Sequence, residues 1–425
     1  GALAPCREFF HRDGRLVNQP FTWGWIASIA LVTASSVWLG LFAYKHVQYE
    51  NELWWSFGFD KDASRFLRAA FGSVTLLFLF AIFELFRPAK PAAAFATVAE
   101  LDKAAVIVAA SPRTAANLAL LGDKRLLFSA DETAFIMYGT QGHSWISMGD
   151  PVGAPDQFDD LVWSFRTHCD RYEALPVFYQ VEADHLPLYL DHGLSLLKIG
   201  EEAQVPLADF ALEGSVRKQL RQTQNRYQKL DCTFEILDYG QVADRIGELR
   251  EVSDEWLREK NAAEKGFSLG NFTEDYIKRF PTAVIWQQGR IIAFANLWAG
   301  SNHEEMSVDL MRYRSNAPAG VMEHLFIELM LWGREHGYRY FSLGMAPLSG
   351  LDNRPLAPLW HRVGGLVFRH GEHFYNFEGL RNYKDKFHPE WRPKYIAAPG
   401  GFHVTRVLGD VATLISGGVR GLITR

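Results

Sequence analysis

The sequence predicts an α/β protein that consists of two similar halves in tandem, preceded by two transmembrane helices. Three observations lead to this prediction. Two long apolar runs lie near the N-terminus, at residues 21–44 and 69–86. Helix and strand patterns alternate from about residue 96 onward. The same order of elements occurs twice in that part of the chain, which is typical of an internal repeat.

The two apolar runs are each long enough to cross the hydrocarbon core of a bilayer. As helices, residues 21–44 would be roughly 36 Å long and residues 69–86 roughly 27 Å long. The alternative for each run is a buried helix of a folded domain. The predicted organisation places an N-terminal segment at residues 1–20, an external loop at residues 45–68 between the spans, and a linker rich in Pro and Ala at residues 87–100.

The remainder of the chain divides into a first half at residues 101–235 and a second half with a C-terminal tail at residues 236–425. Each half has the order helix, three strands, helix, strand. In the first half we expect helices at residues 117–121 and 161–169 and strands at 125–130, 134–139, 144–149 and 175–181. In the second half we expect helices at residues 242–260 and 319–336 and strands at 283–288, 290–300, 304–313 and 338–344.

The composition is that of a folded protein and restricts the chemistry. Hydrophobic residues make up 48% of the 425 residues, charged residues make up 22%, and the formal net charge is −5. Cys6, Cys169 and Cys232 have no CxxC spacing, which favours a reducing compartment over a disulfide framework or a zinc ribbon. We expect no serine nucleophile elbow, no HExxH site and no P-loop, and therefore no metal and no cofactor. The reaction mechanism that these absences leave is direct attack of one substrate on the other, aligned by charged side chains.

A basic helix is predicted at residues 215–229, where the sequence SVRKQLRQTQNRYQK has five cations and no carboxylate. At 100° per residue, Arg217, Lys218, Arg221 and Lys229 share an arc of about 120°. A solvated face usually carries both signs of charge. An anionic partner, either a phosphate backbone or a lipid headgroup, is therefore as well supported as a solvated face.

A carboxylate and a guanidinium interrupt the apolar strand MSVDLMRY. Asp309 and Arg312 are three positions apart, which on a regular strand places them on opposite faces. A carboxylate on a largely apolar strand needs a partner or a function, so buried structural pairing and catalysis are equally supported.

The turn that follows this strand, RYRSNAPAGVMEHL, resembles a pyrophosphate cradle only weakly. Such a cradle needs glycines and free backbone N–H groups at the start of a helix. Pro318 lacks an N–H group, and Gly320 is the single glycine of the turn. The sequence therefore disfavours acyl-CoA as a substrate.

The stretch LRNYKDKFHPEWRPKYIA, residues 380–397, has five cations interleaved with aromatic residues. Arg381, Lys384 and Lys386 alternate with aromatic rings and follow Glu378. This pattern suits the end of a single-stranded nucleic acid, whose phosphates pair with cations and whose bases stack. The alternative is a helix whose long basic side chains cover a core face.

Several separate motifs give the chain a resemblance to a known family. NELWWSF, GDPVG, SVDLMRY, FSLGMAPLSG and FEGLRNYKDKFHPEWRPKY occur in the same order in the C-terminal part of MprF-type phosphatidylglycerol aminoacyltransferases. The resemblance covers both predicted spans and most of the chain that follows them. It implies a tandem GNAT-like domain related to the Fem aminoacyltransferases.

The resemblance also implies a reaction. A lysyl or alanyl group would pass from charged tRNA to a hydroxyl of phosphatidylglycerol, which lowers the negative charge of the membrane and its affinity for cationic antimicrobial peptides. The family's D-x-x-R strand and F-E-G-L-R motif fall on Asp309, Arg312 and Glu378. We expect Asp309 or Glu378 to orient the attacking hydroxyl or the substrate ammonium, and Arg312 and Lys386 to face the developing charge or the tRNA end. The cations expected to bind tRNA or lipid headgroups are Arg217, Lys218, Arg221, Arg381 and Lys384.

The expected partners are aminoacyl-tRNA, phosphatidylglycerol and the bacterial inner membrane. Because charged tRNA is cytosolic, the catalytic part should be cytoplasmic, with the chain ends on the same side of a multi-pass protein. The long flippase portion of the family is expected to be missing from this chain. Two alternatives remain open: a Fem-like enzyme acting on a lipid-linked peptidoglycan precursor, and a membrane-tethered tRNA-binding module without catalysis. The amino acid that is transferred, lysine or alanine, and the oligomeric state, homo-oligomer included, are also open.

Overall fold

The computed structural model describes residues 95–260, 264, 266–351, 377–401 and 403–416, together with residues 74, 75 and 79. The predicted spans at residues 21–44 and 69–86 lie outside the described residues, apart from those three positions, and stay predictions. Among the described residues, no helix is long and apolar enough to cross a membrane. The chain divides into one unit of residues 1–93 and 170–173 and a second unit of residues 94–169 and 174–425. The fold and the site below belong to the second unit.

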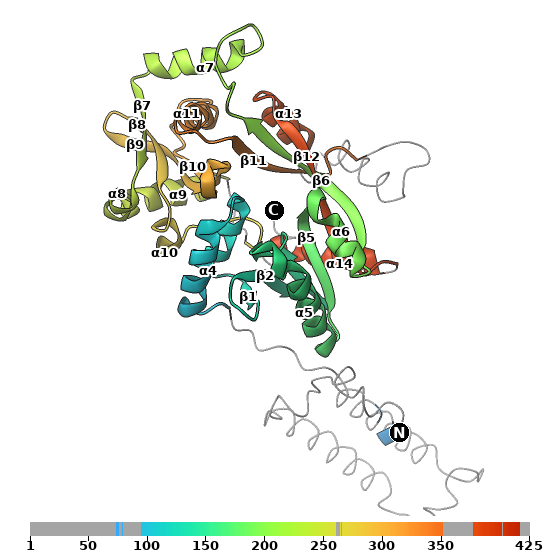
Figure 1. Ribbon diagram of the computed structural model, residues 1–425. Coiled ribbons are helices and arrows are strands. Elements are labelled where there is room, and N and C mark those ends of the chain that lie inside the picture. The colour runs from blue at the N-terminus through green and yellow to red at the C-terminus, as the bar shows by residue number, and fades with distance from the viewer. Residues whose placement is uncertain are drawn as a thin grey trace, which may run out of the picture. The chain divides into compact units, whose positions relative to one another are not determined.

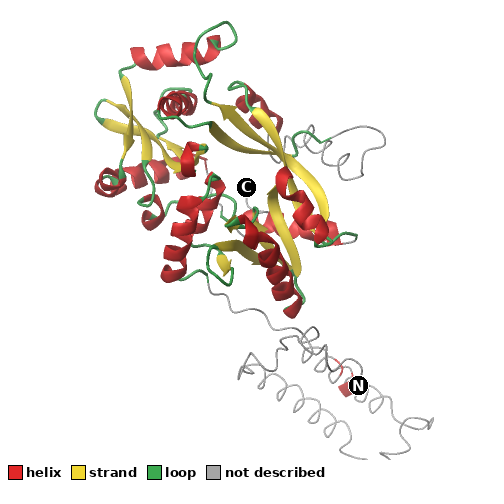
Figure 2. Ribbon diagram, viewed as in Figure 1, coloured by secondary structure: helices red, strands yellow, loops and turns green. Residues whose placement is uncertain are grey.

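In the described part of the chain, twelve strands form one continuous sheet (Figures 1 and 2). Its order is β1-β2-β3-β5-β12-β6-β11-β10-β9-β8-β7, and the short β4 pairs with β2. The strands of the first half are β1 (Arg125–Phe128), β2 (Ala134–Gln141), β3 (Ser144–Met148), β4 (Val152–Gly153), β5 (Leu175–Glu182) and β6 (Ser195–Pro206). The strands that follow are β7 (Cys232–Leu237), β8 (Thr282–Gln287), β9 (Arg290–Ala299), β10 (Glu305–Tyr313), β11 (Tyr340–Pro347) and β12 (Glu390–Ala398).

Helices and short 3-10 turns connect these strands. In the first half they are α4 (Val98–Ala110), η3 (Thr114–Leu121), η4 (Pro155–Gln157), α5 (Phe158–Arg171), η5 (Ala183–His185) and α6 (Leu186–Asp191). The later ones are α7 (Lys218–Lys229), α8 (Tyr239–Asp244), α9 (Ile246–Lys260), α10 (Glu274–Ile277), η6 (Ser301–His303), α11 (Val321–Glu335), α13 (Phe377–Asp385) and α14 (His403–Ile415). A capping box between Thr97 and Glu100 starts α4, so a helix begins inside the predicted linker at residues 87–100.

The two halves repeat one arrangement of strands. β3 and β5 pair in parallel with α5 between them in the sequence, and β10 and β11 pair in parallel with α11 between them. Parallel strands need such a crossover helix. The predicted α/β class with two similar halves is therefore confirmed, while the GNAT-like type remains an implication of the resemblance.

The halves exchange a strand at the middle of the sheet. β6, which belongs to the first half, pairs with β11 of the second half. β12, from the C-terminal part of the chain, lies between β5 and β6 and pairs with both. The predicted boundary between residues 235 and 236 falls inside β7, which pairs with β8, and the sheet is continuous across the two halves.

Two apolar clusters cover the faces of the sheet. One cluster combines residues of both halves, among them Leu118 and Phe135 from the first half and Phe267 and Leu310 from the second. The other lies beneath α7 and α11 and contains side chains such as Tyr227. Because the first cluster draws on both halves, separating the halves would expose apolar surface on each.

Most predicted elements are confirmed, and two differ in type. The helix expected at residues 242–260 is divided into α8 and α9 at Arg245, whose backbone (φ −106°, ψ 11°) is not helical. The helix expected at residues 117–121 is a 3-10 helix. The strand β12 was not expected, because Arg392 and Lys394 interrupt its apolar residues and obscure the pattern of a buried strand.

Candidate active site

A bulge in β10 positions the predicted catalytic residues. Val308 pairs with Leu297 and Met311 pairs with Ala295, so two residues of β10 lie opposite the single residue Asn296 of β9. The Oδ1 atom of Asn296 accepts a hydrogen bond from the backbone N–H of Leu310 at 2.8 Å, which replaces the ladder bond lost at the bulge.

The bulge reverses the alternation of side chains along the strand. Val308, Met311 and Tyr313 all pack against the cluster beneath α7 and α11, whereas Leu310 belongs to the cluster shared by both halves. Asp309 and Arg312 therefore lie on the same side of the sheet, and their charges interact. The expectation that they lie on opposite faces is wrong. The bulge inserts one extra residue between Asp309 and Arg312, so the two side chains point to the same face of the sheet.

Asp309 is half-buried and accepts two hydrogen bonds. The Tyr276 hydroxyl donates to Oδ2 at 2.7 Å, and the backbone N–H of Gly270 donates to Oδ1 at 2.8 Å. Burial raises the pKa of Asp309, while these two bonds and the charges of Lys124 and Arg312 oppose that rise. A Cβ atom on Gly270 would lie 1.8 Å from Oδ2 of Asp309, so only glycine brings its N–H group this close.

Arg312 is buried, and its guanidinium contacts the same loop. Nη2 donates to Oε2 of Glu264 at 3.0 Å, and the guanidinium carbon lies 4.2 Å from the ring centre of Trp256. Burial lowers the pKa of Arg312, with Glu264 and Asp309 acting in the opposite direction. Its Nε atom has no hydrogen-bond partner among the described residues.

Two charged residues of the first half approach Asp309, and sequence reasoning did not identify them. Nζ of Lys124 donates to Oδ1 of Asp123 at 2.6 Å and interacts electrostatically with Asp309. Oδ2 of Asp123 accepts the backbone N–H of Phe267 at 2.9 Å. Both residues precede an ordinary apolar strand, so no sequence pattern separates them from surface charges.

The loop that contacts Asp309 has the spacing of a serine nucleophile motif. Its residues 266–270 read GFSLG. A nucleophile elbow lies between a strand and a helix, whereas these residues lie between α9 and α10. The pattern GxSxG, which we did not expect, is therefore present, but its spacing alone does not make Ser268 a nucleophile.

Two of the predicted site residues on α13 differ in their contacts: among the described residues, Arg381 is bound to other side chains of the fold, and Glu378 is not. Nη1 of Arg381 donates to Oε2 of Glu201 at 2.6 Å, and its guanidinium stacks over Trp391. Glu378 is exposed in the first turn of α13 and makes no hydrogen bond or ion pair with any described residue. The hydrogen bonds and ion pairs of the described residues do not connect Glu378 with Asp309.

Lys384 and Lys386 are held against other elements. Nζ of Lys384 is buried and donates to the carbonyl oxygens of Gly344 and Met345, both at 2.9 Å. Burial lowers the pKa of Lys384 to about 8. Nζ of Lys386 donates to Oε2 of Glu323, at the start of α11, at 2.8 Å. Their predicted contacts with substrate stay predictions.

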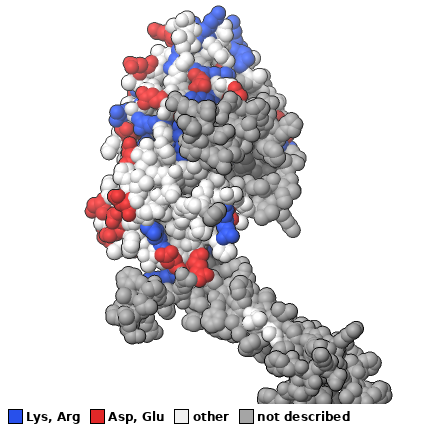
Figure 3. Space-filling view, turned by 90° about the vertical axis from the view of Figure 1, so that its right-hand side faces the viewer, with Lys and Arg blue, Asp and Glu red and all other residues white. Residues whose placement is uncertain are grey.

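The basic helix α7 has two kinds of cation. Arg217 donates to the carbonyl oxygen of Phe387 at 2.9 Å, and Arg221 donates to that of Gly214 at 3.0 Å, so both arginines fix the local backbone. Lys218 and Lys229 are exposed and have no partner among the described residues. Figure 3 shows basic side chains gathered at the top of the molecule, where α7 lies in Figure 1.

The turn before α11 is covered by α7. The hydroxyl of Tyr227 donates to the carbonyl oxygen of Pro318, and Arg226 donates to that of Ala319. A Cβ atom on Gly320 would lie 2.7 Å from Nη2 of Arg226. These contacts occupy the start of the helix, where a pyrophosphate would bind.

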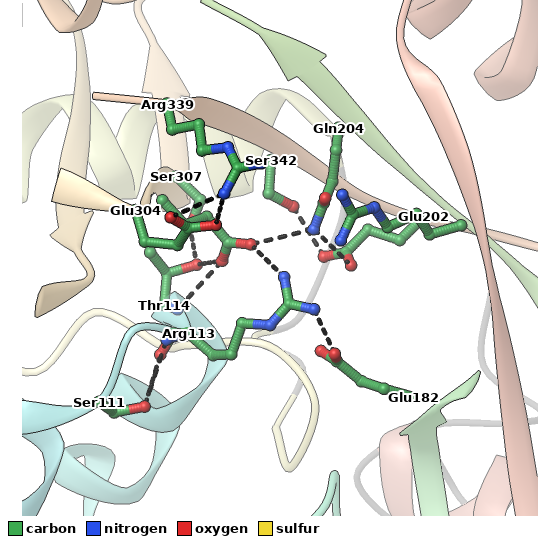
Figure 4. Close-up of polar contacts among 12 residues, drawn as sticks. Ser111, Arg113, Thr114, Glu182, Glu202, Gln204, Glu304, Ser307, Arg339 and Ser342 are labelled. Atoms are coloured by element: carbon green, nitrogen blue, oxygen red, sulfur yellow. Dashed lines mark hydrogen bonds and ion pairs between the residues drawn. The ribbon is translucent and has the colours of Figure 1, made fainter. Parts of the chain in front are cut away.

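Ionised side chains also gather where the two halves join, on β5, β6, β10, β12 and the start of η3 (Figure 4). Arg113 bridges Glu182 and Glu305, with 3.1 Å from its Nη1 atom to Oε2 of Glu305. The seam cluster, as we name this group, comprises Arg113, Glu182, Glu202, Gln204, Glu305 and Lys394.

Lys394 lies between two carboxylates of the seam cluster. Its Nζ atom is 3.1 Å from Oε1 of Glu182 and 3.2 Å from Oε2 of Glu202. Burial raises the pKa of Glu182, but Lys394 and Arg113 outweigh this effect and lower it to about 2. Burial lowers the pKa of Lys394, and the two carboxylates outweigh this effect and raise it. The sequence showed Lys394 as one cation of a basic stretch and gave no sign of these partners.

The fold and the site define a class: a mixed α/β protein of two repeats in one sheet, with buried ionised groups where the repeats meet. Within this class, residues 105–398 match the family model described as phosphatidylglycerol lysyltransferase, C-terminal. The chain belongs to this family.

Curated relatives and solved structures agree with this assignment. The chain is 38% identical over 302 residues to the phosphatidylglycerol lysyltransferase of Bacillus subtilis (69% of this chain, 35% of the relative). It is 36% identical over 281 residues to that of Staphylococcus aureus (66% and 33%). The match thus spans about one third of the length of these relatives.

Two solved structures are similar over most of the described residues. One is a C-terminal domain ascribed to a lysylphosphatidylglycerol synthetase of Agrobacterium fabrum, with 44% identity, a TM-score of 0.68, and coverage of 76% of this chain and 98% of that one. The other is the L-PGS of Bacillus licheniformis, with 38% identity, a TM-score of 0.64, and coverage of 74% and 96%.

Proposed function

We propose that this chain transfers an aminoacyl group from charged tRNA to a hydroxyl of phosphatidylglycerol. The observation that carries the proposal is the family match over residues 105–398, which includes most of the twelve-stranded sheet, Asp309 and Arg312. The named relatives support phosphatidylglycerol as the acceptor. The tRNA donor, and lysine or alanine as the group transferred, follow from the resemblance and belong to the proposal.

The chemistry requires little beyond alignment and charge. The aminoacyl ester is already activated, so the lipid hydroxyl oxygen attacks the ester carbon, the tRNA hydroxyl leaves, and the lipid proton passes to the leaving oxygen. Asp309 is the candidate to orient the attacking hydroxyl or the substrate ammonium. Arg312 is the candidate to stabilise the oxyanion. Both roles require the loop at residues 266–272 to admit substrate.

The remaining predicted residues have supporting roles in this proposal. Glu378 is exposed at the start of α13 and is the second candidate to orient the hydroxyl. Lys386 would face the developing charge or the tRNA end, and Arg381 and Lys384 would border that site. On α7, the exposed Lys218 is a better candidate for contact with tRNA phosphates than Arg217 and Arg221, whose guanidinium groups already have backbone partners.

The membrane arrangement is part of the same proposal. Residues 21–44 and 69–86 would cross the bacterial inner membrane, and the catalytic part would lie in the cytoplasm, where charged tRNA is found. A flippase portion would belong to the longer protein of which this chain corresponds to about a third.

The test is direct transfer of label. The full chain is incubated with tRNA charged with labelled lysine or, in parallel, labelled alanine, and with phosphatidylglycerol vesicles. We expect label in the lipid extract, from one of the two donors in preference to the other. Binding of charged and uncharged tRNA without lipid labelling would instead indicate a tRNA-binding module. Labelling of a lipid-linked peptide in place of phosphatidylglycerol would support the Fem-like alternative, which the named relatives do not favour.

A further inference from the structure

The carboxylate of Asp309 is fixed by two hydrogen bonds from other elements of the second half. Tyr276 of α10 donates its hydroxyl to Oδ2, and Gly270 donates its backbone N–H to Oδ1. These two bonds define the plane and the direction of the carboxylate. Asp309 cannot rotate to meet a substrate without losing one of them.

Tyr276 is itself held in place. Its side chain is 1% exposed, and its ring contacts that of Phe280 at a centroid distance of 5.0 Å in an edge-on arrangement. Burial and the neighbouring carboxylate raise the pKa of Tyr276, so its hydroxyl keeps its proton and acts as a donor.

Lys124 of the first half lies against the loop of this site, with Nζ 5.8 Å from the ring centre of Phe267. Burial lowers the pKa of its ammonium group, and the charges of Asp123 and Asp309 oppose that shift. Its side chain is 1% exposed, and Nζ is held by Oδ1 of Asp123 and by the carbonyl oxygen of Leu118 at 3.2 Å. Fully buried lysines are rare unless they are paired. One carboxylate and one carbonyl fix the ammonium group, and Asp309 is the second carboxylate with which it interacts.

The charged and titratable groups that face Asp309 come from three elements. They are Arg312 on β10, Tyr276 on α10, and Lys124 on the segment before β1. Asp123 contributes a negative charge next to Lys124, and Glu264 contributes one next to Arg312. Each cation near Asp309 therefore has a carboxylate partner of its own.

We propose that Lys124 and Tyr276 are positioning residues for Asp309: Tyr276 orients its carboxylate, and Lys124, through Asp123, holds the loop of Phe267 and Gly270 against it from the first half. This inference rests on the proposed function, because it concerns the same transfer site. It assigns to the first half a direct part in a site whose other residues belong to the second half.

The chain offers a matched control for the tyrosine. In the first half, the hydroxyl of the buried Tyr189 donates to Oδ1 of Asp150 at 2.7 Å, and Asp150 also accepts a backbone N–H, that of Glu182, at 3.0 Å. Tyr189→Phe removes the same kind of bond at the same burial as Tyr276→Phe. Both variants should lose similar stability, typically about 1–3 kcal/mol for a buried hydrogen bond to a charged group.

The experiment measures label transfer to phosphatidylglycerol vesicles by the full chain and by its variants. For Tyr276→Phe we expect kcat to fall about tenfold to a hundredfold, with KM for charged tRNA little changed, because a misoriented carboxylate affects the reacting geometry. For Tyr189→Phe we expect kcat close to that of the wild type. For Lys124→Met we expect kcat to fall by about tenfold, with KM for charged tRNA little changed, because the loop that carries Gly270 loses its contact with the first half, and Lys124→Arg should restore part of the activity.

The outcomes separate this inference from the proposed function. If the wild-type chain does not label lipid, the proposed function fails, and this inference fails with it. If the wild type is active and Tyr276→Phe loses no more activity than Tyr189→Phe, Tyr276 has no positioning role. If the kcat of folded Lys124→Met matches that of the wild type, Lys124 does not position the loop at Asp309. Should Lys124→Met fail to fold, the tyrosine pair still decides the role of Tyr276.

Discussion

Replacing Lys394 by methionine should cost more stability than any other single loss of an ion pair in the described fold. Lys394 is 7% exposed and compensates two carboxylates, Glu182 and Glu202, that lie on different strands. Methionine fills a similar volume but leaves Glu202 without its ion-pair partner and Glu182 with Arg113 alone. Removing one partner of a buried ion pair typically costs about 3–5 kcal/mol.

The pKa of Glu182 gives a second value for the stability that its ion pairs contribute. Its pKa falls from 4.5 to about 2 in the folded chain, which corresponds to ~3 kcal/mol of stability at neutral pH. Because the folded pKa is depressed, this contribution is present above pH 4.5 and is lost as the pH falls toward 2. The difference between wild type and Lys394→Met should therefore be largest near pH 7 and should shrink below about pH 4.5.

Urea unfolding at several pH values measures this difference. At pH 7 we expect the free energy of unfolding of Lys394→Met to be about 3–5 kcal/mol lower than that of the wild type. Lys103→Met is the control, because Lys103 and Glu132 form an exposed pair at 2.5 Å whose loss should cost about 1 kcal/mol or less. A difference at pH 7 no larger than that of the control would refute the reasoning. So would a difference that does not narrow between about pH 5.5 and 3.5.

Three further predictions concern Gly270, the two exposed lysines of α7, and Lys384. Gly270→Ala should lower the free energy of unfolding by about 1–3 kcal/mol and reduce lipid labelling, because its Cβ would meet a carboxylate oxygen at 1.8 Å. Gly247→Ala in α9, with no atom within 4 Å, is the control and should lower neither stability nor labelling. Replacing Lys218 and Lys229 together by glutamine should flatten the salt dependence of transfer by about one unit of slope or more, measured from 50 to 200 mM salt, and an unchanged slope would indicate a merely solvated face. Burial lowers the pKa of Lys384 to about 8, so between pH 8 and 10.5 the unfolded chain carries a proton on this lysine that the folded chain lacks. The free energy of unfolding of the wild type should therefore rise relative to that of Lys384→Met as the pH increases from 8 toward 10.5. A difference between the two proteins that stays constant over this range would contradict the prediction.

The regular elements of the fold were accessible from the sequence because their signals are local. The apolar run of β9 and the apolar face of α11 each depend on residues within one or two turns or pleats. The repeat was accessible for the same reason, as an order of such elements. β12 was not, because a strand that buries Lys394 and carries Arg392 beside it has no apolar pattern until its ionic partners are known.

The candidate site was accessible only in part. Asp309 and Arg312 were identified from a motif and from charge on an apolar strand. Their shared face was not, because the bulge at Asn296 appears only when β10 pairs with β9. Lys124 and Tyr276 were missed entirely, since each looks in the sequence like an ordinary residue beside an apolar segment.

The sequence by itself determined the α/β class, the two repeats, the family and the motif residues, because periodicity and motif spacing are properties of neighbouring residues. Only the tertiary structure decided what each charge does. The basic stretch at residues 380–397 predicted a surface for anions, yet Lys384 and Lys394 are buried, and Lys394 meets Glu182, which lies 212 positions away in the chain. Ion pairs form between residues that strand order and register bring together, and that order is set by the packing of the whole sheet.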